Sequence, residues 1–160
     1  MGYFVRAFCT QGGPPPLRPI LAFSAEHGAP FDLDPDVSGP GLDDSHWDRA
    51  GIVYKDHKAS ILLELSRADG NDESLMHEEI EEFLELLEDA PKNRHRRRVE
   101  TNLRNTRFIV AAQLPPSGID EDGFAALGNI MRYLIINNGA MIQADGEGFY
   151  EGEKIIVELE

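Results

Sequence analysis

The 160-residue sequence has a single cysteine, no apolar run long enough to cross a membrane and no secretory signal. Cys9 has no second cysteine to pair with, which is typical of a protein from a reducing compartment. A membrane-spanning helix needs roughly 18 or more consecutive apolar residues, so we expect no association with a membrane. The opening stretch, MGYFVRAFC, lacks the basic and apolar regions of a signal peptide. These absences predict a cytoplasmic location.

The sequence also lacks the motifs that mark common catalytic sites. It contains no G-x-S-x-G nucleophile motif, no H-E-x-x-H or C-x-x-C metal motif, and no glycine-rich stretch followed by G-K-[ST]. Cys9 has no identifiable histidine partner that would activate it as a nucleophile. We therefore expect no catalysis and no cofactor. The sequence favours a non-catalytic, intracellular protein-binding or assembly domain.

Basic residues are few. The chain contains 15 Lys and Arg against 29 Asp and Glu, which gives a formal net charge of −14. Nonspecific binding to nucleic acid or to an anionic membrane requires a positive surface, so this balance disfavours both. It favours solubility and an interaction with cations or with a basic partner.

The basic residues that are present gather after Pro91. Residues 72–89 contain nine acids, whereas residues 92–107 contain seven of the 15 basic residues. Acids one helical turn apart, such as Glu81 and Glu85, cost about 0.2–0.5 kcal/mol per pair, and a basic neighbour would relieve this repulsion. The pattern predicts that the basic segment neutralises the acidic helix or joins two copies in a homo-oligomer, with nucleic-acid binding as the disfavoured alternative. The predicted interaction residues are Arg94, Arg96, Arg97 and Arg98.

Two acidic stretches contain ligand types that suit a divalent metal. Carboxylate and imidazole groups occur together in DDSHWD, residues 43–48, and carboxylates recur in the glycine-rich stretch before the C-terminal strand. A calcium loop would need an acid or amide at its fifth position, where the second stretch has Phe149, and neither stretch has a fixed ligand spacing. A metal-dependent, hydrolase-like enzyme is therefore the alternative function, with candidate ligands Asp43, His46, Asp145 and Glu147.

Apolar periodicity predicts alternating strands and helices along the chain. The expected strands are residues 3–9, 31–34, 51–55, 60–67, 106–116, 140–145 and 153–160. The expected helices are residues 73–89, with Asp72 or Ser74 as N-cap, 92–103 and 120–138. Residues 17–28 are predicted as a short helix with Pro19 in its first turn, and an extended segment is the alternative. The C-terminal stretch from Gln143 is predicted as one β-hairpin.

These elements predict one α+β domain over residues 1–160, with helices packed on a mixed, mainly antiparallel sheet. Each half can be interpreted as strand, helix, strand, strand, so we expect a weak internal repeat and a ferredoxin-like sheet. The last helix should pack through a stripe of Phe124, Leu127, Met131 and Leu134. The side chains expected in the core are Phe83, Leu87, Leu127, Met131 and Leu134.

Overall fold

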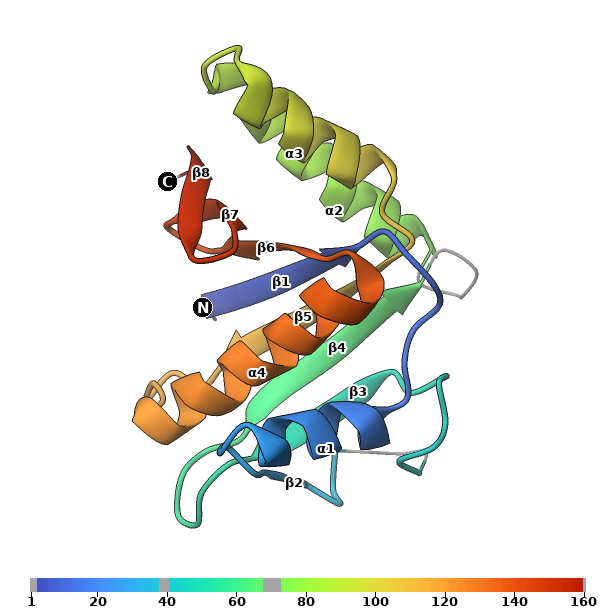
Figure 1. The fold of residues 1–160 in the computed structure, drawn as a ribbon, viewed down its shortest axis with the longest axis vertical. Coiled ribbons are helices and arrows are strands. Elements are labelled where there is room, and N and C mark those ends of the chain that lie inside the picture. Colours follow the sequence, from blue (N-terminus) through green and yellow to red (C-terminus); the bar gives the residue numbers. More distant parts are fainter. Residues whose placement is uncertain (1–2, 38–40, 68–72, 160) are drawn as a thin grey trace.

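The computed structural model of the chain describes residues 3–37, 41–67 and 73–159. The strands in this part are β1 (Tyr3–Cys9), β2 (Asp32–Leu33), β3 (Arg49–Val53), β4 (Ile61–Arg67), β5 (Phe108–Leu114), β6 (Met141–Ala144), β7 (Gly148–Glu151) and β8 (Lys154–Glu158). The helices are α1 (Leu17–Glu26), α2 (Glu73–Leu86), α3 (Arg94–Arg104) and α4 (Glu121–Asn138), with one 3-10 turn, η1 (Leu87–Asp89). Together they form a single α+β domain (Figure 1).

The described strands form one eight-stranded open sheet in the order β2-β3-β4-β5-β1-β6-β7-β8. Each pair of neighbours in this sheet is antiparallel. The prediction of a mainly antiparallel sheet is confirmed, and the expectation of a mixed sheet is wrong. The connection through α1 leads from β1 to β2 past three intervening strands, and the connection through α4 leads from β5 to β6 past β1. Strands that run in the same direction are therefore never neighbours.

Helices cover both faces of the sheet, as Figure 1 shows for α1 and α4 on the near side. Adjacent residues of a strand point to opposite faces, so β1 sends Ala7 into one core and Phe8 into the other. The first core contains Ile130 and Leu134 of α4, and the second contains Phe83 of α2. None of the helices in the described part of the chain is both long and apolar enough to span a membrane.

The long helix α4 has a clear beginning and end. The side chain of Asp120 accepts a hydrogen bond from the backbone N–H of Gly123 at 3.1 Å, which caps the first turn. At the other end Gly139 adopts a left-handed conformation with φ of +58°, which favours glycine. Leu134 is buried as predicted, but Phe124 is exposed. The buried side of α4 instead includes Gly123, Ala126 and Ile130 beside the predicted Leu127, Met131 and Leu134.

The predicted core residues Phe83, Leu87, Leu127, Met131 and Leu134 are all buried. Residues 17–26 form the predicted helix rather than an extended segment. The hairpin of β3 and β4 also forms, with β3 beginning at Arg49 rather than at Gly51. The predicted cap Asp72 and the side chain of Ser74 lie outside the described residues.

The acidic and basic helices form a hairpin around Pro91. The last turn of the predicted 73–89 helix tightens into η1, and Ala90 is extended, as expected for a residue before proline. The side chain of Asn93 then accepts a hydrogen bond from the backbone N–H of Arg96 at 3.0 Å and caps α3. This hairpin places the basic helix α3 beside the C-terminal strands.

The C-terminal hairpin prediction is wrong in one respect, because the stretch forms three strands rather than two. A turn after Ala144 leads into β7, and a second turn at Gly152 leads into β8. Phe149 of β7 is fully buried in the second core. Its burial stabilises the pairing of this short segment with the sheet. Gly148 has φ of +136°, and a Cβ there would lie 2.0 Å from the carbonyl oxygen of Val157. Glycine is therefore required where β7 begins.

Candidate functional site

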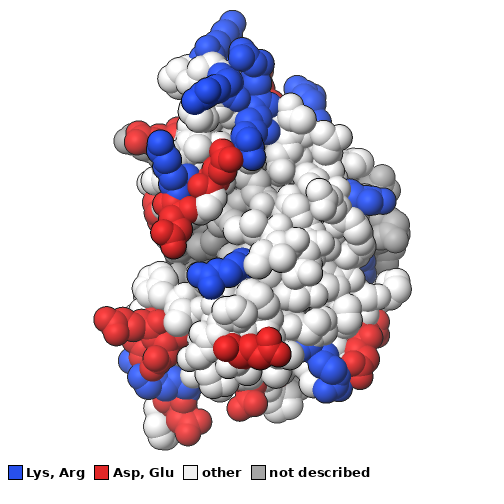
Figure 2. Space-filling view, in the orientation of Figure 1, with Lys and Arg blue, Asp and Glu red and all other residues white. Residues whose placement is uncertain are grey.

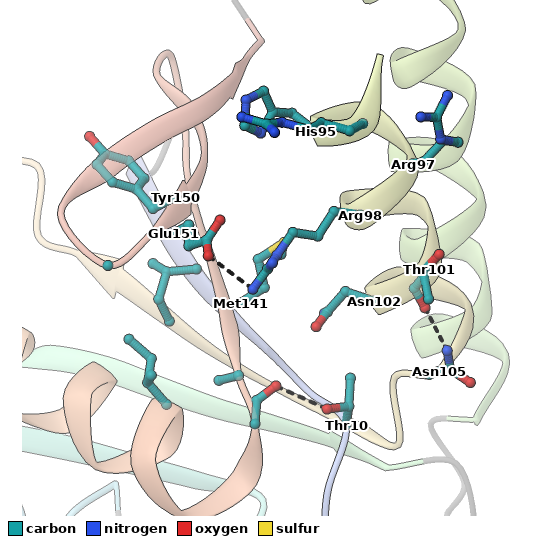
Figure 3. Close-up of a pocket in the computed structure, with 16 residues that line it drawn as sticks. Thr10, His95, Arg97, Arg98, Thr101, Asn102, Asn105, Met141, Tyr150 and Glu151 are labelled. Atoms are coloured by element: carbon teal, nitrogen blue, oxygen red, sulfur yellow. Dashed lines mark hydrogen bonds and ion pairs between the residues drawn. The ribbon is translucent and has the colours of Figure 1, made fainter. Parts of the chain in front are cut away.

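A cleft of about 1100 Å³ opens between α3 and the strands β6 and β7 (Figure 3). Its floor comes from the segment after β1 and from the start of β6, where the Thr10 hydroxyl donates to the carbonyl of Gly139 at 3.0 Å. One wall is α3, and the other contains Ile142, Tyr150 and Glu151. The lining residues are Thr10, Arg94, His95, Arg97, Arg98, Thr101, Asn102, Asn105, Ile135, Gly139, Ala140, Met141, Ile142, Tyr150, Glu151 and Gly152.

The α3 wall is basic in its first half and carries amides and hydroxyls in its second. Figure 2 shows the blue Lys and Arg side chains gathered at the end of the molecule where α3 lies. In Figure 3, Arg98 and Asn102 extend towards β6 and β7, whereas Arg97 stands at the rim and points away from Glu151. Arg94 lies one helical turn before Arg98 on the same wall. The predicted interaction residues Arg94, Arg97 and Arg98 thus share one cleft.

One ion pair crosses the cleft. Arg98 Nη2 lies 3.0 Å from Glu151 Oε1, with both side chains about half exposed to solvent. Exposed ion pairs of this kind contribute roughly 0–1 kcal/mol, so water and competing anions can displace them at little cost. Glu151 is the one carboxylate among the residues that line the cleft. The cleft therefore keeps an excess of positive charge in an acidic protein.

Hydrogen bonds of Asn102 and Tyr150 hold the two walls of the cleft in place. The side-chain amide of Asn102 donates to the backbone carbonyl of Phe8 at 3.2 Å, which ties α3 to β1. The hydroxyl of Tyr150 donates to the carboxylate of Glu147, and this hydrogen bond is the main cause of the raised pKa of Tyr150. Tyr3 donates to the same carboxylate, and the two hydroxyls lower the pKa of Glu147.

Arg96 has a different role from its neighbours. Its Nη1 donates to the backbone carbonyls of Ala90 at 3.0 Å and Glu88 at 3.4 Å, and its Nε lies 3.5 Å from Glu100. It thereby satisfies the last carbonyls of the preceding helix. It does not line the cleft. Within the described residues, the ion pairs of the α3 arginines go to Glu100 and Glu151, and none reaches an acid of α2, so the predicted neutralisation is not made by direct contact.

The candidate metal ligands lie in two separate places. Asp43 accepts from Arg18 at 2.7 and 3.1 Å, while the nearby His46 is largely exposed, with Nδ1 3.7 Å from Asp44. At the other place, Glu147 is held by the two tyrosines. Among the residues that the structure describes, no group of three or more His, Cys, Asp or Glu side chains is arranged to hold a metal ion.

The fourth candidate ligand, Asp145, belongs to a partly buried network around Arg6. Asp145 accepts from Arg6 Nη1 at 2.7 Å, from the Phe4 N–H at 3.1 Å and from Gln143 Nε2 at 3.2 Å. Burial alone would raise the pKa of Asp145, but these hydrogen bonds outweigh it and the pKa is lowered.

Arg6 connects this turn to the helix on the second face of the sheet. Its Nε contacts the carboxylate of Glu79 in α2, and its guanidinium lies 5.3 Å from the centre of the Phe83 ring. Burial raises the pKa of Glu79, with Arg6 acting in the opposite direction. The network fixes α2 and the turn between β6 and β7 to β1. The sequence patterns gave no sign of it, because its three charged residues, Arg6, Glu79 and Asp145, are more than 60 positions apart.

Three comparisons with known proteins were made. The sequence matches no protein-family model. No significant match was found among curated proteins or among solved structures.

Proposed function

We propose that the chain is a non-catalytic binding domain and that the cleft between α3 and β6–β7 holds an acidic, extended segment of a partner protein. The observation that carries the proposal is the position of Arg94 and Arg98, one helical turn apart on one wall of an open cleft. Within the cleft their charge is opposed by one exposed carboxylate, that of Glu151. Arginine forms paired hydrogen bonds with carboxylates, which makes it suited to this ligand.

The spacing of the arginines supports an extended ligand. Residues four apart on a helix are separated by about 6 Å along its axis, and alternate side chains of an extended chain are separated by about 6.6–6.8 Å. Two carboxylates in an acidic-x-acidic sequence can therefore face Arg94 and Arg98 together. The wall from Arg94 to Asn105 is about 16 Å long at 1.5 Å per residue, which accommodates about five extended residues. The amides and hydroxyls at its far end provide partners for the ligand backbone.

The charge of the whole protein favours a short acidic segment over nucleic acid. The formal net charge is −14, and a long polyanion would meet repulsion outside the cleft. A segment with two or three carboxylates places its charge beside the arginines alone. The open shape of the cleft also fits a peptide better than an enclosed small molecule.

We also propose that the fold is a ferredoxin-like core with additions. The central strands β4-β5-β1-β6 and the helices α1 and α4 follow the order of a split β-α-β-β-α-β unit, with β2 and β3 inserted between α1 and β4, and α2 and α3 between β4 and β5. The proposed internal repeat has less support. The meander of the first half joins the centre through its last strand, β4, whereas that of the second half joins through its first, β6.

A fluorescein-labelled peptide with a central Glu-Gly-Glu tests the proposed function. We expect saturable binding that weakens about tenfold or more in the double variant Arg94→Gln, Arg98→Gln, because each charge-assisted hydrogen bond contributes about 1.5–3 kcal/mol. The matched control is Arg104→Gln with Arg107→Gln. Both control residues are exposed, and neither lines the cleft, so this variant loses the same charge but should bind within about twofold of the native protein.

Three outcomes would contradict the proposal. The first is the absence of peptide binding, and the second is an equal loss in the two double variants, which would indicate a general charge effect. The third is tighter binding of a single-stranded oligonucleotide that is lost only in the Arg94 and Arg98 variant, which would assign the cleft to nucleic acid.

The same helix allows binding and stability to be separated. Arg96→Gln should keep the peptide affinity and lower the free energy of unfolding by about 1–2 kcal/mol, since it leaves carbonyls at the end of η1 without their partner. Arg97→Gln, at the rim, should leave stability within about 0.5 kcal/mol. Chemical denaturation of both variants measures this. Equal stability of the two would show that Arg96 has no structural role.

A further inference from the structure

Helix α4 has a second stripe of residues, on the side away from the core. We call this the outer stripe, and it consists of Glu121, Phe124, Ala125, Gly128, Arg132 and Ile135. All six are exposed. The exposed fraction is 57% for Phe124 and 37% for Ile135. Their spacing at three, four and seven residues places them on one side of the helix. Figure 2 shows few charged side chains over the middle of this face, where α4 lies in Figure 1.

Gly128 at the middle of the outer stripe has no explanation within one copy of the chain. A Cβ at this position would meet nothing within 4 Å, so packing inside the domain does not require glycine. Glycine in a helix interior also stabilises the helix less than alanine does. A residue without a side chain on an outer helix face is what another helix needs in order to approach closely.

The outer stripe has one acid at its start and one base towards its end. Glu121 lies in the first turn, and Arg132 lies three turns further on. Lys55 pairs with the neighbouring Asp120 and Asp122 at 3.1 and 2.8 Å. Within the described part of the chain, neither Glu121 nor Arg132 has an ion pair. Both charges remain available to a partner.

We propose that the outer stripe packs against the outer stripe of a second copy of this chain, with the two α4 helices antiparallel about a two-fold axis. An antiparallel register that sets Glu121 opposite Arg132 of the second copy also sets Ala125 opposite Gly128. Two-fold symmetry then forms each contact twice. The small residues meet at the crossing point, and Phe124 of each copy is covered beside it.

This self-complementarity is what identifies the occupant. One stripe carries an acid at one end, a base towards the other and small residues between them, so it fits its own antiparallel copy. A different protein would need its own helix with an acid, small residues and a base at the same spacing. Of the outer stripe, Ile135 also lines the cleft, but Glu121, Gly128 and Arg132 do not, and the basic residues of the cleft lie on α3. Substitutions at these positions therefore test the two proposals independently.

Charge exchange tests the proposed dimer. Sedimentation equilibrium of the native chain between about 1 and 200 µM should show a reversible dimer. Arg132→Glu should raise the dimer dissociation constant about tenfold or more, because it places like charges opposite each other twice. Adding Glu121→Arg to that variant should restore the dissociation constant to within about threefold of the native value, since the pair is formed again with its signs exchanged. Far-UV circular dichroism should stay native throughout, because both residues are exposed.

A second variant keeps the test independent of charge. Gly128→Leu should weaken the dimer at least as much as Arg132→Glu, since a large side chain separates the helices while it leaves the folded monomer intact. A monomer at about 200 µM, a dimer unaffected by Arg132→Glu and Gly128→Leu, or a failure of the exchanged pair to restore association would each overturn the proposal.

Discussion

Replacing Leu134 with Asp is expected to unfold the protein or to lower its free energy of unfolding by about 3–5 kcal/mol. Leu134 is 0% exposed and packs in the core between α4 and the sheet. A carboxylate there loses its water and finds no cation among the apolar side chains around it. Domains of this size are stable by about 5–15 kcal/mol, so the loss removes a large part of the total. Chemical denaturation monitored by circular dichroism measures it.

The matched control is Ile136→Asp, two residues further along the same helix. Ile136 is 63% exposed, so the new carboxylate stays hydrated. The expected loss is about 1 kcal/mol or less, from a negative charge near the C-terminal end of a helix. If the two variants are equally stable, or if the Leu134 variant is soluble and unchanged, the assignment of the buried face of α4 is wrong.

Replacing Arg6 with Met is expected to cost about 2–4 kcal/mol at pH 7, because it leaves the carboxylate of Glu79 buried without its cation. The side chains of Arg6 and Glu79 are 15% and 26% exposed, so water relieves only part of the penalty. The same substitution removes the hydrogen bond of Arg6 to Gln143 in β6, and its hydrogen bond and ion pair with Asp145 in the turn after β6. Met keeps an apolar side chain next to Phe83, so the substitution mainly tests the charge of Arg6.

The loss should be larger at pH 7 than at pH 5. Burial raises the pKa of Glu79 in the folded state above its unfolded value, and the loss of Arg6 raises it further. A raised folded pKa means that the folded state binds more protons, so stability falls as the pH rises through that pKa. The pKa of Asp145 is lowered in the native protein, and the stability it contributes above its unfolded pKa also depends on Arg6. Glu79 therefore reduces the deficit between pH 7 and pH 5, whereas Asp145 reduces it only below its unfolded pKa of about 4.

A second substitution isolates the buried charge. Adding Glu79→Gln to Arg6→Met should recover at least about 1 kcal/mol at pH 7, since a neutral amide is cheaper to bury than an unpaired carboxylate. A deficit that is independent of pH and unaffected by Glu79→Gln would mean that Arg6 acts through packing alone.

Local patterns in the sequence predicted the helices well and the sheet less well. The limits of α4 follow from signals within a few residues, namely the cap Asp120 and the left-handed Gly139. The strand β7 was missed because its two flanking turns and its short length make it resemble a loop. The position of Phe124 was also wrong, since a helix with apolar residues on two sides does not indicate which side faces the core.

The candidate site could be predicted only in part. The charge of α3 marked its arginines, and helical spacing contains a signal that separates Arg96 from the others, because it shares a face with the buried Val99 and Leu103. The opposite wall could not be found in this way. Glu151 follows Arg98 by more than 50 positions, and only the fold brings them to 3.0 Å.

The most direct test of the proposed cleft is a nuclear magnetic resonance titration of the ¹⁵N-labelled protein with the unlabelled Glu-Gly-Glu peptide. The account predicts that amide shifts change in α3, in β6 and β7 and at Gly139, together with the side-chain Nε–H signal of Arg98 as its pair with Glu151 is exchanged for the ligand. Shifts in α1 and in the first half of α4 should stay constant. Changes centred on those helices would contradict the account. So would the absence of any change at a peptide concentration tenfold above a Kd of roughly 100 µM.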